Sequence, residues 1–193
     1  MLSLLYKLML SLFYNTMSSY VMITSSDRDS RHWLPDIKFS PDGKSFATAS
    51  MDHKIYIYNR DSYRLKGTCD RHNSFIKGFD YSEDSMYIQS DSGDNEHLYF
   101  EAEDGEYFAS GSQLKDIRWS GWTCLFGWPV QGAWPHFSDV ESGLECEPTA
   151  VNRSPDRKLL AVGNQKGEVR LLNYPAIVKR VSTFPYLFLA LFI

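Results

Sequence analysis

Two stretches of the chain, residues 37–59 and 151–173, follow one pattern and align without a gap over 23 positions. Six positions are identical in the two copies: Ser40/Ser154, Pro41/Pro155, Asp42/Asp156, Lys44/Lys158, Ala47/Ala161 and Asn59/Asn173. A weaker third copy occupies residues 79–101, and its Ser82 follows Ser40 by 42 residues. Recurrence of this kind predicts a repeated supersecondary unit.

Each copy contains short apolar runs separated by turn residues. In the first copy, a run that ends at Phe39 leads into Ser-Pro-Asp, where proline presets φ and Asp42 can accept a local hydrogen bond. The runs FATAS and KIYIYN follow, with a polar turn at Asp52 between them. We predict outer fourth strands at residues 63–69 and 106–110.

Three or four short strands in about 40 residues are the pattern of a β-propeller blade. The sequence therefore predicts an all-β fold of about three to four blades, which is an incomplete propeller. The turn residues that we expect to hold the blades are Asp42, Asp52, Asp94, Asp156 and Gly167.

The composition agrees with a β domain and excludes one class of partner. The chain has 193 residues, long enough for a core, and 15% of them are aromatic, which suits pleated, half-buried surfaces. Its formal net charge of −4 argues against a nucleic-acid binder, which needs a basic face to neutralise phosphates.

No catalytic, cofactor or metal motif is visible. The three cysteines, Cys69, Cys124 and Cys146, form no CxxC pair, so we expect three reduced thiols and neither a zinc site nor a redox pair. The five histidines are scattered, with no HExxH, and there is no GxSxG elbow or phosphate-binding loop. We therefore predict that the chain is not an enzyme.

Charged residues offer weaker signals. The acidic run at 91–106 fails as a calcium loop, because counting from Asp91 places Gly93 third and Glu96 sixth. We expect a solvated acidic loop there. Three lysines of the first copy could form a basic patch or be ordinary surface residues: Lys38, Lys44 and Lys54.

Residues 119–137 read WSGWTCLFGWPVQGAWPHF and hold four of the five tryptophans. The spacing from Ser82 to Ser154 is 72 residues instead of 42, so this run belongs either to most of one more blade or to a long insertion between blades. Residues 116–119 and 123–126 are predicted strands. The rings either pack between layers of sheet or form a patch that binds a protein. The candidates for partner binding are Trp122, Phe126, Trp128 and Trp134.

SPDGKSFATASMDHKIYIYN resembles a WD40 repeat. His72 stands where that family has the histidine of its Gly-His pair, so the resemblance implies a structural, hydrogen-bonding histidine. Tyr58 stands near the place of the signature Trp, which weakens the family's His–Ser/Thr–Asp–Trp network.

SFIKGFDYSEDSMYIQSDSGDNEHLYF, followed by DIRWSGWTCLFGWPVQGAW, is similar to the echinoderm microtubule-associated protein-like (EMAP-like) family over residues 30–175. The resemblance implies a piece of the second of two seven-bladed propellers. It also implies a non-catalytic scaffold without cofactors that binds tubulin or microtubules and is cytoplasmic and cytoskeleton-associated. The coiled coil that many members carry and the HELP motif that precedes the first propeller are not recognisable here.

The two ends differ from the middle. We divide the chain into an irregular apolar segment at 1–29, a partial propeller at 30–175 and an apolar tail at 176–193. Neither apolar end reaches the ~20 residues that span a bilayer, so a membrane partner is not expected. A WD40 adaptor for another protein, or a membrane-associated fragment, remains an alternative. An unclosed propeller leaves two blade faces unpaired, so we expect marginal stability.

Overall fold

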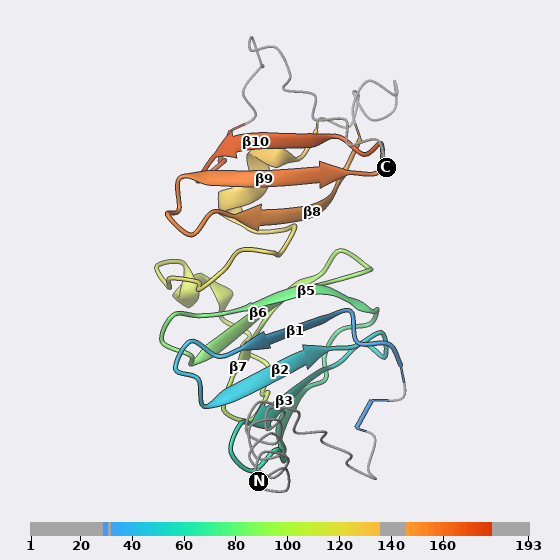
Figure 1. The fold of residues 1–193 in the computed structure, drawn as a ribbon, viewed down its shortest axis with the longest axis vertical. Helices are drawn as coiled ribbons and strands as arrows, with labels where there is room; N and C mark the ends of the chain where they lie inside the picture. Colours follow the sequence, from blue (N-terminus) through green and yellow to red (C-terminus); the bar gives the residue numbers. More distant parts are fainter. Residues whose placement is uncertain (1–28, 31, 136–145, 179–193) are drawn as a thin grey trace, which may run out of the picture.

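The computed structural model describes residues 29–30, 32–135 and 146–178. From the sequence, we set apart an apolar segment at 1–29 and an apolar tail at 176–193. Most of both, residues 1–28 and 179–193, lies outside the described residues. The described part forms three small antiparallel sheets stacked one upon another (Figure 1). No helix within it combines the length and the apolar character that crossing a bilayer requires.

The first sheet has the order β1-β2-β3-β4, the second β5-β6-β7 and the third β10-β9-β8. The strands of the first sheet are β1 (Asp36–Phe39), β2 (Ser45–Ala49), β3 (Ile55–Asn59) and β4 (Leu65–Cys69). Those of the second and third sheets are β5 (Ile76–Tyr81), β6 (Tyr87–Ser92), β7 (His97–Glu101), β8 (Pro148–Arg153), β9 (Leu159–Asn164) and β10 (Val169–Asn173). Each sheet contains one sequence copy, so the all-β prediction of blade-like sheets is confirmed.

One turn recurs at the same place in all three sheets. In the first sheet, the Ser45 N–H donates to Ser40 Oγ at 3.0 Å, and Ser40 Oγ donates to the Asp42 carboxylate at 2.6 Å. The same hydroxyl-to-carboxylate bond joins Ser82 to Asp84 at 2.5 Å and Ser154 to Asp156 at 2.6 Å. The residues that follow these aspartates have positive φ: Gly43 (68°), Ser85 (64°) and Arg157 (59°). The Ser-x-Asp spacing therefore encodes one backbone shape.

These turns also touch one another across the sheets. The backbone N–H of Asp42 in the first sheet donates to Ser85 Oγ in the second at 3.0 Å. Arg157 in the third sheet forms an ion pair with Glu83 in the second. The three turns consequently lie along one edge of the stack, as expected when equivalent blades sit side by side.

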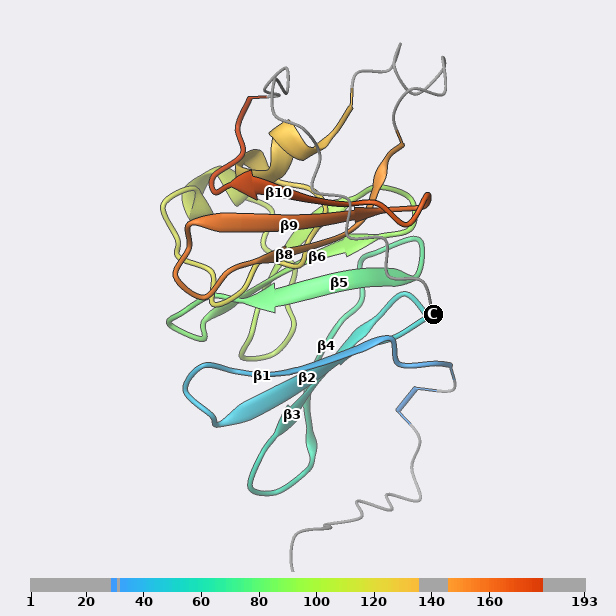
Figure 2. The same cartoon turned by 45° about the horizontal axis from the view of Figure 1, so that its top comes forward.

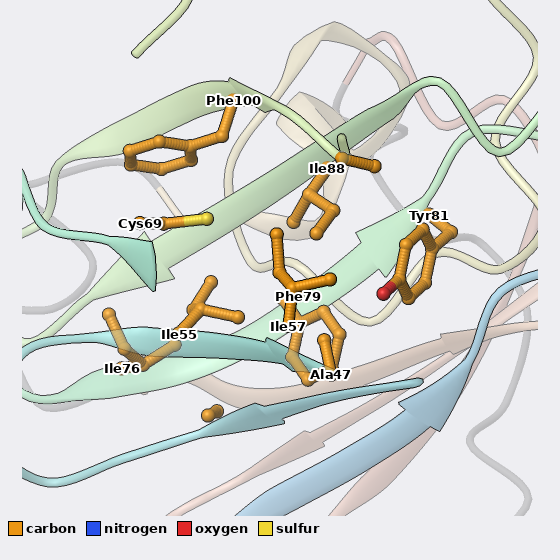
Figure 3. Close-up of a cluster of buried hydrophobic side chains, with 11 residues drawn as sticks. Ala47, Ile55, Ile57, Cys69, Ile76, Phe79, Tyr81, Ile88 and Phe100 are labelled. Carbon is orange, nitrogen blue, oxygen red and sulfur yellow. The ribbon is translucent and has the colours of Figure 1, made fainter. Parts of the chain in front are cut away.

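The first and second sheets bury a common apolar core (Figure 3). The first sheet contributes Ala47, Ile55 and Ile57, and the second Phe79, Ile88 and Phe100, and all six side chains are inaccessible to solvent. Small and β-branched residues of one sheet face large aromatic rings of the other, and this fills the space between them.

The first and third sheets, which end the stack, each expose apolar side chains on one face. Val169 and Leu171 in β10 are 59% and 63% exposed, whereas Ile55 and Ile57, at the same positions of the first copy, are fully buried. At the other end, Ile37 on the outer face of β1 is 60% exposed. Each outer sheet thus presents an apolar face that no other described sheet covers.

Of the two outer strands predicted from the sequence, one is confirmed and one is wrong. Residues 63–69 contain β4, which pairs with β3 and completes the first sheet. Residues 106–110 do not form a strand; Tyr107 makes only an isolated bridge with Phe100. The second sheet is therefore left with three strands.

Candidate interaction surface on the tryptophan segment

Residues 116–135, here called the tryptophan segment, run from the second sheet to the third, and the gold 3-10 helix of the segment lies beyond β10 (Figure 2). The segment is an inter-sheet insertion with one short 3-10 helix, η2 (Trp128–Ala133), and it adds no further blade. The predicted strands at 116–119 and 123–126 are wrong. Trp119 makes one isolated bridge to Ser82, and the N–H groups farther along donate to buried carboxylates of the second sheet instead of to a neighbouring strand.

Asp80 of β5 is one of these carboxylates. Only 1% of it is exposed, and its Oδ2 accepts hydrogen bonds from the backbone N–H groups of Thr123 at 2.7 Å and Cys124 at 3.4 Å. Its Oδ1 lies 3.0 Å from Lys38 Nζ of the first sheet. A charged acceptor with several donors is a strong, directional anchor. Asp80 therefore ties the first sheet, the second sheet and the segment together.

Asp91 of β6 is the second carboxylate, and it is fully buried. Its Oδ2 accepts the Phe126 N–H at 3.0 Å, and its Oδ1 is 2.5 Å from His97 Nδ1. Asp80 and Asp91 together bind three N–H groups within four consecutive residues of the segment, which fixes its course along the second sheet.

Arg153 of β8 attaches the segment to the third sheet. Its Nη2 donates to the carbonyl oxygen of Trp119 at 2.7 Å and to that of Ser120 at 3.2 Å. Its guanidinium lies 5.2 Å from the ring centre of Tyr174, a cation–π arrangement. The backbone N–H of Arg153 also donates to Trp122 O at 3.2 Å. The segment is therefore bonded to a sheet on either side.

The first two tryptophans of the segment pack inside the protein. Trp119 and Trp122 are 5% and 4% exposed, and they share a core with Leu125, Val130 and apolar residues of β8 and β9. Trp119 also stacks on Tyr99 of β7, with ring centres 5.9 Å apart. Trp122, one of the candidates for partner binding, has its ring in this core, so it cannot offer a surface without unfolding.

The other three candidates, Phe126, Trp128 and Trp134, are at least partly exposed and lie close together in the sequence, and we call them the aromatic patch. Phe126 and Trp134 are half-buried and stack with ring centres 5.1 Å apart, and Trp134 Nε1 donates to Leu125 O at 2.8 Å. Trp128 is 49% exposed. Gly127, between the first two, has φ = 112°, and a Cβ there would lie 2.6 Å from the Trp122 ring. A glycine is thus required where the chain turns outward to present Trp128.

The histidine that the WD40 resemblance singles out is buried. His72 Nε2 lies 2.8 Å from Ser90 Oγ of β6, and Glu96 lies 3.7 Å from His72 Nδ1. Burial lowers the pKa of His72, and the nearby carboxylates of Glu96, Asp94 and Asp91 oppose that effect without cancelling it. The neutral imidazole is therefore favoured, as suits a hydrogen-bonding role inside a blade.

The remaining turn residues lie at the second turn of each sheet. Asp52 accepts a hydrogen bond from the Tyr56 hydroxyl at 2.8 Å, and Asp94 accepts one from Ser92 Oγ. Gly167, at the equivalent turn of the third sheet, has φ = 78°. Tyr58, near the place of the WD40 Trp, bonds instead to Asp29 at 3.1 Å.

The three lysines do not form a basic patch. Lys38 is directed inward to Asp80, while Lys44 and Lys54 lie 3.6 Å and 2.6 Å from Asp42 and Asp70. Each is close to a carboxylate of the chain itself. The acidic run is likewise partly paired, since Glu103 lies 2.5 Å from Lys66.

Comparison with known proteins identifies the family. The model of the echinoderm microtubule-associated protein second beta-propeller matches residues 10–186. The chain belongs to the echinoderm microtubule-associated protein family. This match confirms the resemblance and the assignment to the second propeller, and it extends beyond both ends of the 30–175 segment, whose boundaries stay a prediction.

Individual members of the family are similar over most of this chain. It is 38% identical over 143 residues (72% of this chain, 21% of the relative) to the 77 kDa echinoderm microtubule-associated protein of Lytechinus variegatus. It is 37% identical over 162 residues (82% and 19%) to echinoderm microtubule-associated protein-like 1 of Mus musculus. Echinoderm microtubule-associated protein-like 4 of Homo sapiens is 35% identical over 169 residues (85% and 17%). The chain spans about a fifth of the length of these relatives.

Proposed function

We propose that this chain is a non-catalytic, cytoplasmic scaffold that binds tubulin or microtubules through the aromatic patch. The family relationship supports the class of partner, because the relatives are named as microtubule-associated proteins. The fold supports the class of function, because stacked blades commonly present surfaces to other proteins.

One observation carries the choice of surface. Trp128 is 49% exposed, yet the residues before it are held by Asp91 and the residues after it by the core that Val130 enters. An exposed tryptophan on a fixed backbone loses little conformational freedom on binding, and tryptophan is enriched among the residues that dominate interface energies.

The test is co-sedimentation of the 193-residue chain with polymerised tubulin, using Trp128→Ala as the main variant. We expect binding to weaken about tenfold or more, the effect of removing an interface hot spot. Trp128 is largely outside the core, so the fold should survive its replacement, and near-UV circular dichroism checks this.

The matched control is Trp33→Ala. Trp33 is 85% exposed and lies beside the first sheet, far along the chain from the aromatic patch. The Trp33→Ala variant should bind polymerised tubulin as the unmodified chain does. Equal losses in both variants would remove the aromatic patch as the binding surface. Absence of the unmodified chain from the microtubule pellet would instead favour the alternative of an adaptor for another protein.

A further inference from the structure

We propose that Asp91, His97 and Cys124 form a site for a divalent transition-metal ion such as Zn²⁺. One donor atom from each side chain lies within 4.8 Å of the other two. None of the usual short metal-binding motifs joins these residues, since the first two are 6 positions apart in the sequence and the last two are 27 positions apart. The topology of the blade, rather than a local motif, brings them together.

The sheet register sets the first pair. Asp91 of β6 and His97 of β7 are directly opposed across the antiparallel ladder, so their side chains lie on the same face of the second sheet. Cys124 reaches that face from the tryptophan segment, where Asp80 holds its N–H at 3.4 Å. The donors thus come from two strands and the insertion.

The donor set suits a tetrahedral borderline metal. Carboxylate oxygen, imidazole nitrogen and thiolate sulfur are the three ligand types that Zn²⁺ takes in proteins. The other ring nitrogen of the histidine is also engaged, since His97 Nε2 lies 3.1 Å from the Tyr99 hydroxyl. An outer partner of this kind orients a ligating histidine and fixes its tautomer.

Burial also favours a cation here. Asp91 and Cys124 are fully buried, while 13% of the His97 side chain is exposed, so the cluster touches solvent only at the histidine. The thiol makes only weak contacts, at 3.8 Å to the carbonyl oxygens of Gly78 and Gln89. A buried carboxylate needs a compensating charge, and a divalent ion matches one carboxylate and one thiolate.

Binding requires two proton movements. The Cys124 thiol releases its proton to solvent as the sulfur bonds to the metal. A neutral His97 ring with its hydrogen on Nδ1 changes tautomer by exchange with solvent, so that Nδ1 loses a proton, Nε2 gains one, and the Tyr99 oxygen accepts the Nε2–H. Asp91 Oδ2 keeps the Phe126 N–H throughout, so the tryptophan segment stays attached.

The test is titration of the 193-residue chain with Co²⁺, which reports its ligands by absorption. We expect a thiolate-to-cobalt charge-transfer band in the near ultraviolet, its loss on adding Zn²⁺, and a higher Tm in Zn²⁺ than in chelator. Cys124→Ala should abolish the band. Cys146→Ser, which removes a half-buried cysteine outside the cluster, should keep it.

Two conservative variants keep the test decisive if Cys124→Ala fails to fold. Asp91→Asn retains an oxygen for the Phe126 N–H, and Tyr99→Phe retains the ring that stacks on Trp119. We expect Tyr99→Phe to weaken Co²⁺ binding about 10–100-fold, and Asp91→Asn to weaken it more. Absence of a thiolate band in the unmodified chain, or a band that survives Cys124→Ala, would overturn the proposal.

Discussion

The Thr123 backbone N–H donates to the Asp80 carboxylate at 2.7 Å, although 43 residues separate the two. This bond explains why the tryptophan segment is not a strand, because the N–H group that a strand would direct at its neighbour is bound to a side chain. The same carboxylate faces Lys38 of the first sheet, so one buried charge joins three parts of the fold.

Asp80→Ala should cost about 3 kcal/mol or more of unfolding free energy. Burial alone would lower the pKa of Lys38, but the carboxylates of Asp80 and Asp36 raise it above its usual value. Removing Asp80 leaves the Lys38 cation largely buried and the N–H of Thr123 without its acceptor. Breaking a buried pair by removing one partner is costly because the remaining charge is not compensated. Urea unfolding followed by tryptophan fluorescence measures the loss.

Asp36→Ala is the control for that loss. Asp36 lies 3.3 Å from Lys38 Nζ, but its side chain is 28% exposed. Among the described hydrogen bonds, none runs from a backbone N–H of the tryptophan segment to Asp36. We expect about 0–1 kcal/mol, as for a surface ion pair. Similar costs for both variants would show that Asp80 acts only as a counter-charge.

Arg153→Lys should loosen the third sheet from the tryptophan segment. A lysine lacks the planar group that reaches the carbonyls of Trp119 and Ser120 while lying over the Tyr174 ring. We expect a loss of about 1.5–3 kcal/mol, the range for hydrogen bonds to a charged group. Arg118→Lys, at an exposed position of the segment, should change stability little, and equal Tm values for the two variants would contradict the role of Arg153.

Gly167→Ala tests the left-handed turn alone. Gly167 has φ = 78°, and no atom lies within 4 Å of a Cβ built there, so any cost comes from the backbone. We expect a loss of about 1 kcal/mol, because an L-residue is strained at that φ. Gly163→Ala in β9, where the nearest contact is an ordinary 3.9 Å, should be neutral, and a neutral Gly167→Ala would show that the turn relaxes.

Acidification should destabilise the chain through His72. Burial holds its pKa below the unfolded value of 6.5, so the unfolded chain binds the proton more readily than the folded one. The stabilisation is complete above pH 6.5 and is lost as the pH falls toward the folded pKa, with a slope of at most about 1.4 kcal/mol per pH unit. Urea unfolding between pH 7.5 and about 5.5 measures the slope. The slope should be smaller in His72→Gln, and identical slopes would exclude this histidine.

The repeated parts of the fold could be predicted from the sequence because their determinants are local. The spacing of Ser40 and Asp42 specifies a turn whose hydrogen bonds close within six residues, and the same holds in the other copies. The runs that became β2, β3 and β4 have apolar residues beside such turns. The pairing of Asp91 with His97 could also have been derived, since a turn at residues 92–96 places them opposite each other.

The tryptophan segment could not be predicted in this way because its determinants are distant. Its apolar runs look like strands, but the acceptors of its N–H groups are carboxylates of Asp80 and Asp91, 35 to 44 residues earlier. Lys38 looked like a surface lysine for the same reason, since nothing near it in the chain reveals the buried carboxylate. The exposure of Trp128 beside the buried Trp122 depends on this routing.

The attachment of Phe126 to Asp91 has a mechanical consequence. Phe126 is only two positions from Trp128, so a force applied to Trp128 would load the hydrogen bond between the Phe126 N–H and Asp91. The force would then act on the second sheet through the Asp91 side chain and would not separate a strand from the edge of the sheet. On the other side, Arg153 would resist movement of the preceding turn. Tension at this point would therefore be shared between two sheets, so the segment should yield only when both are disturbed.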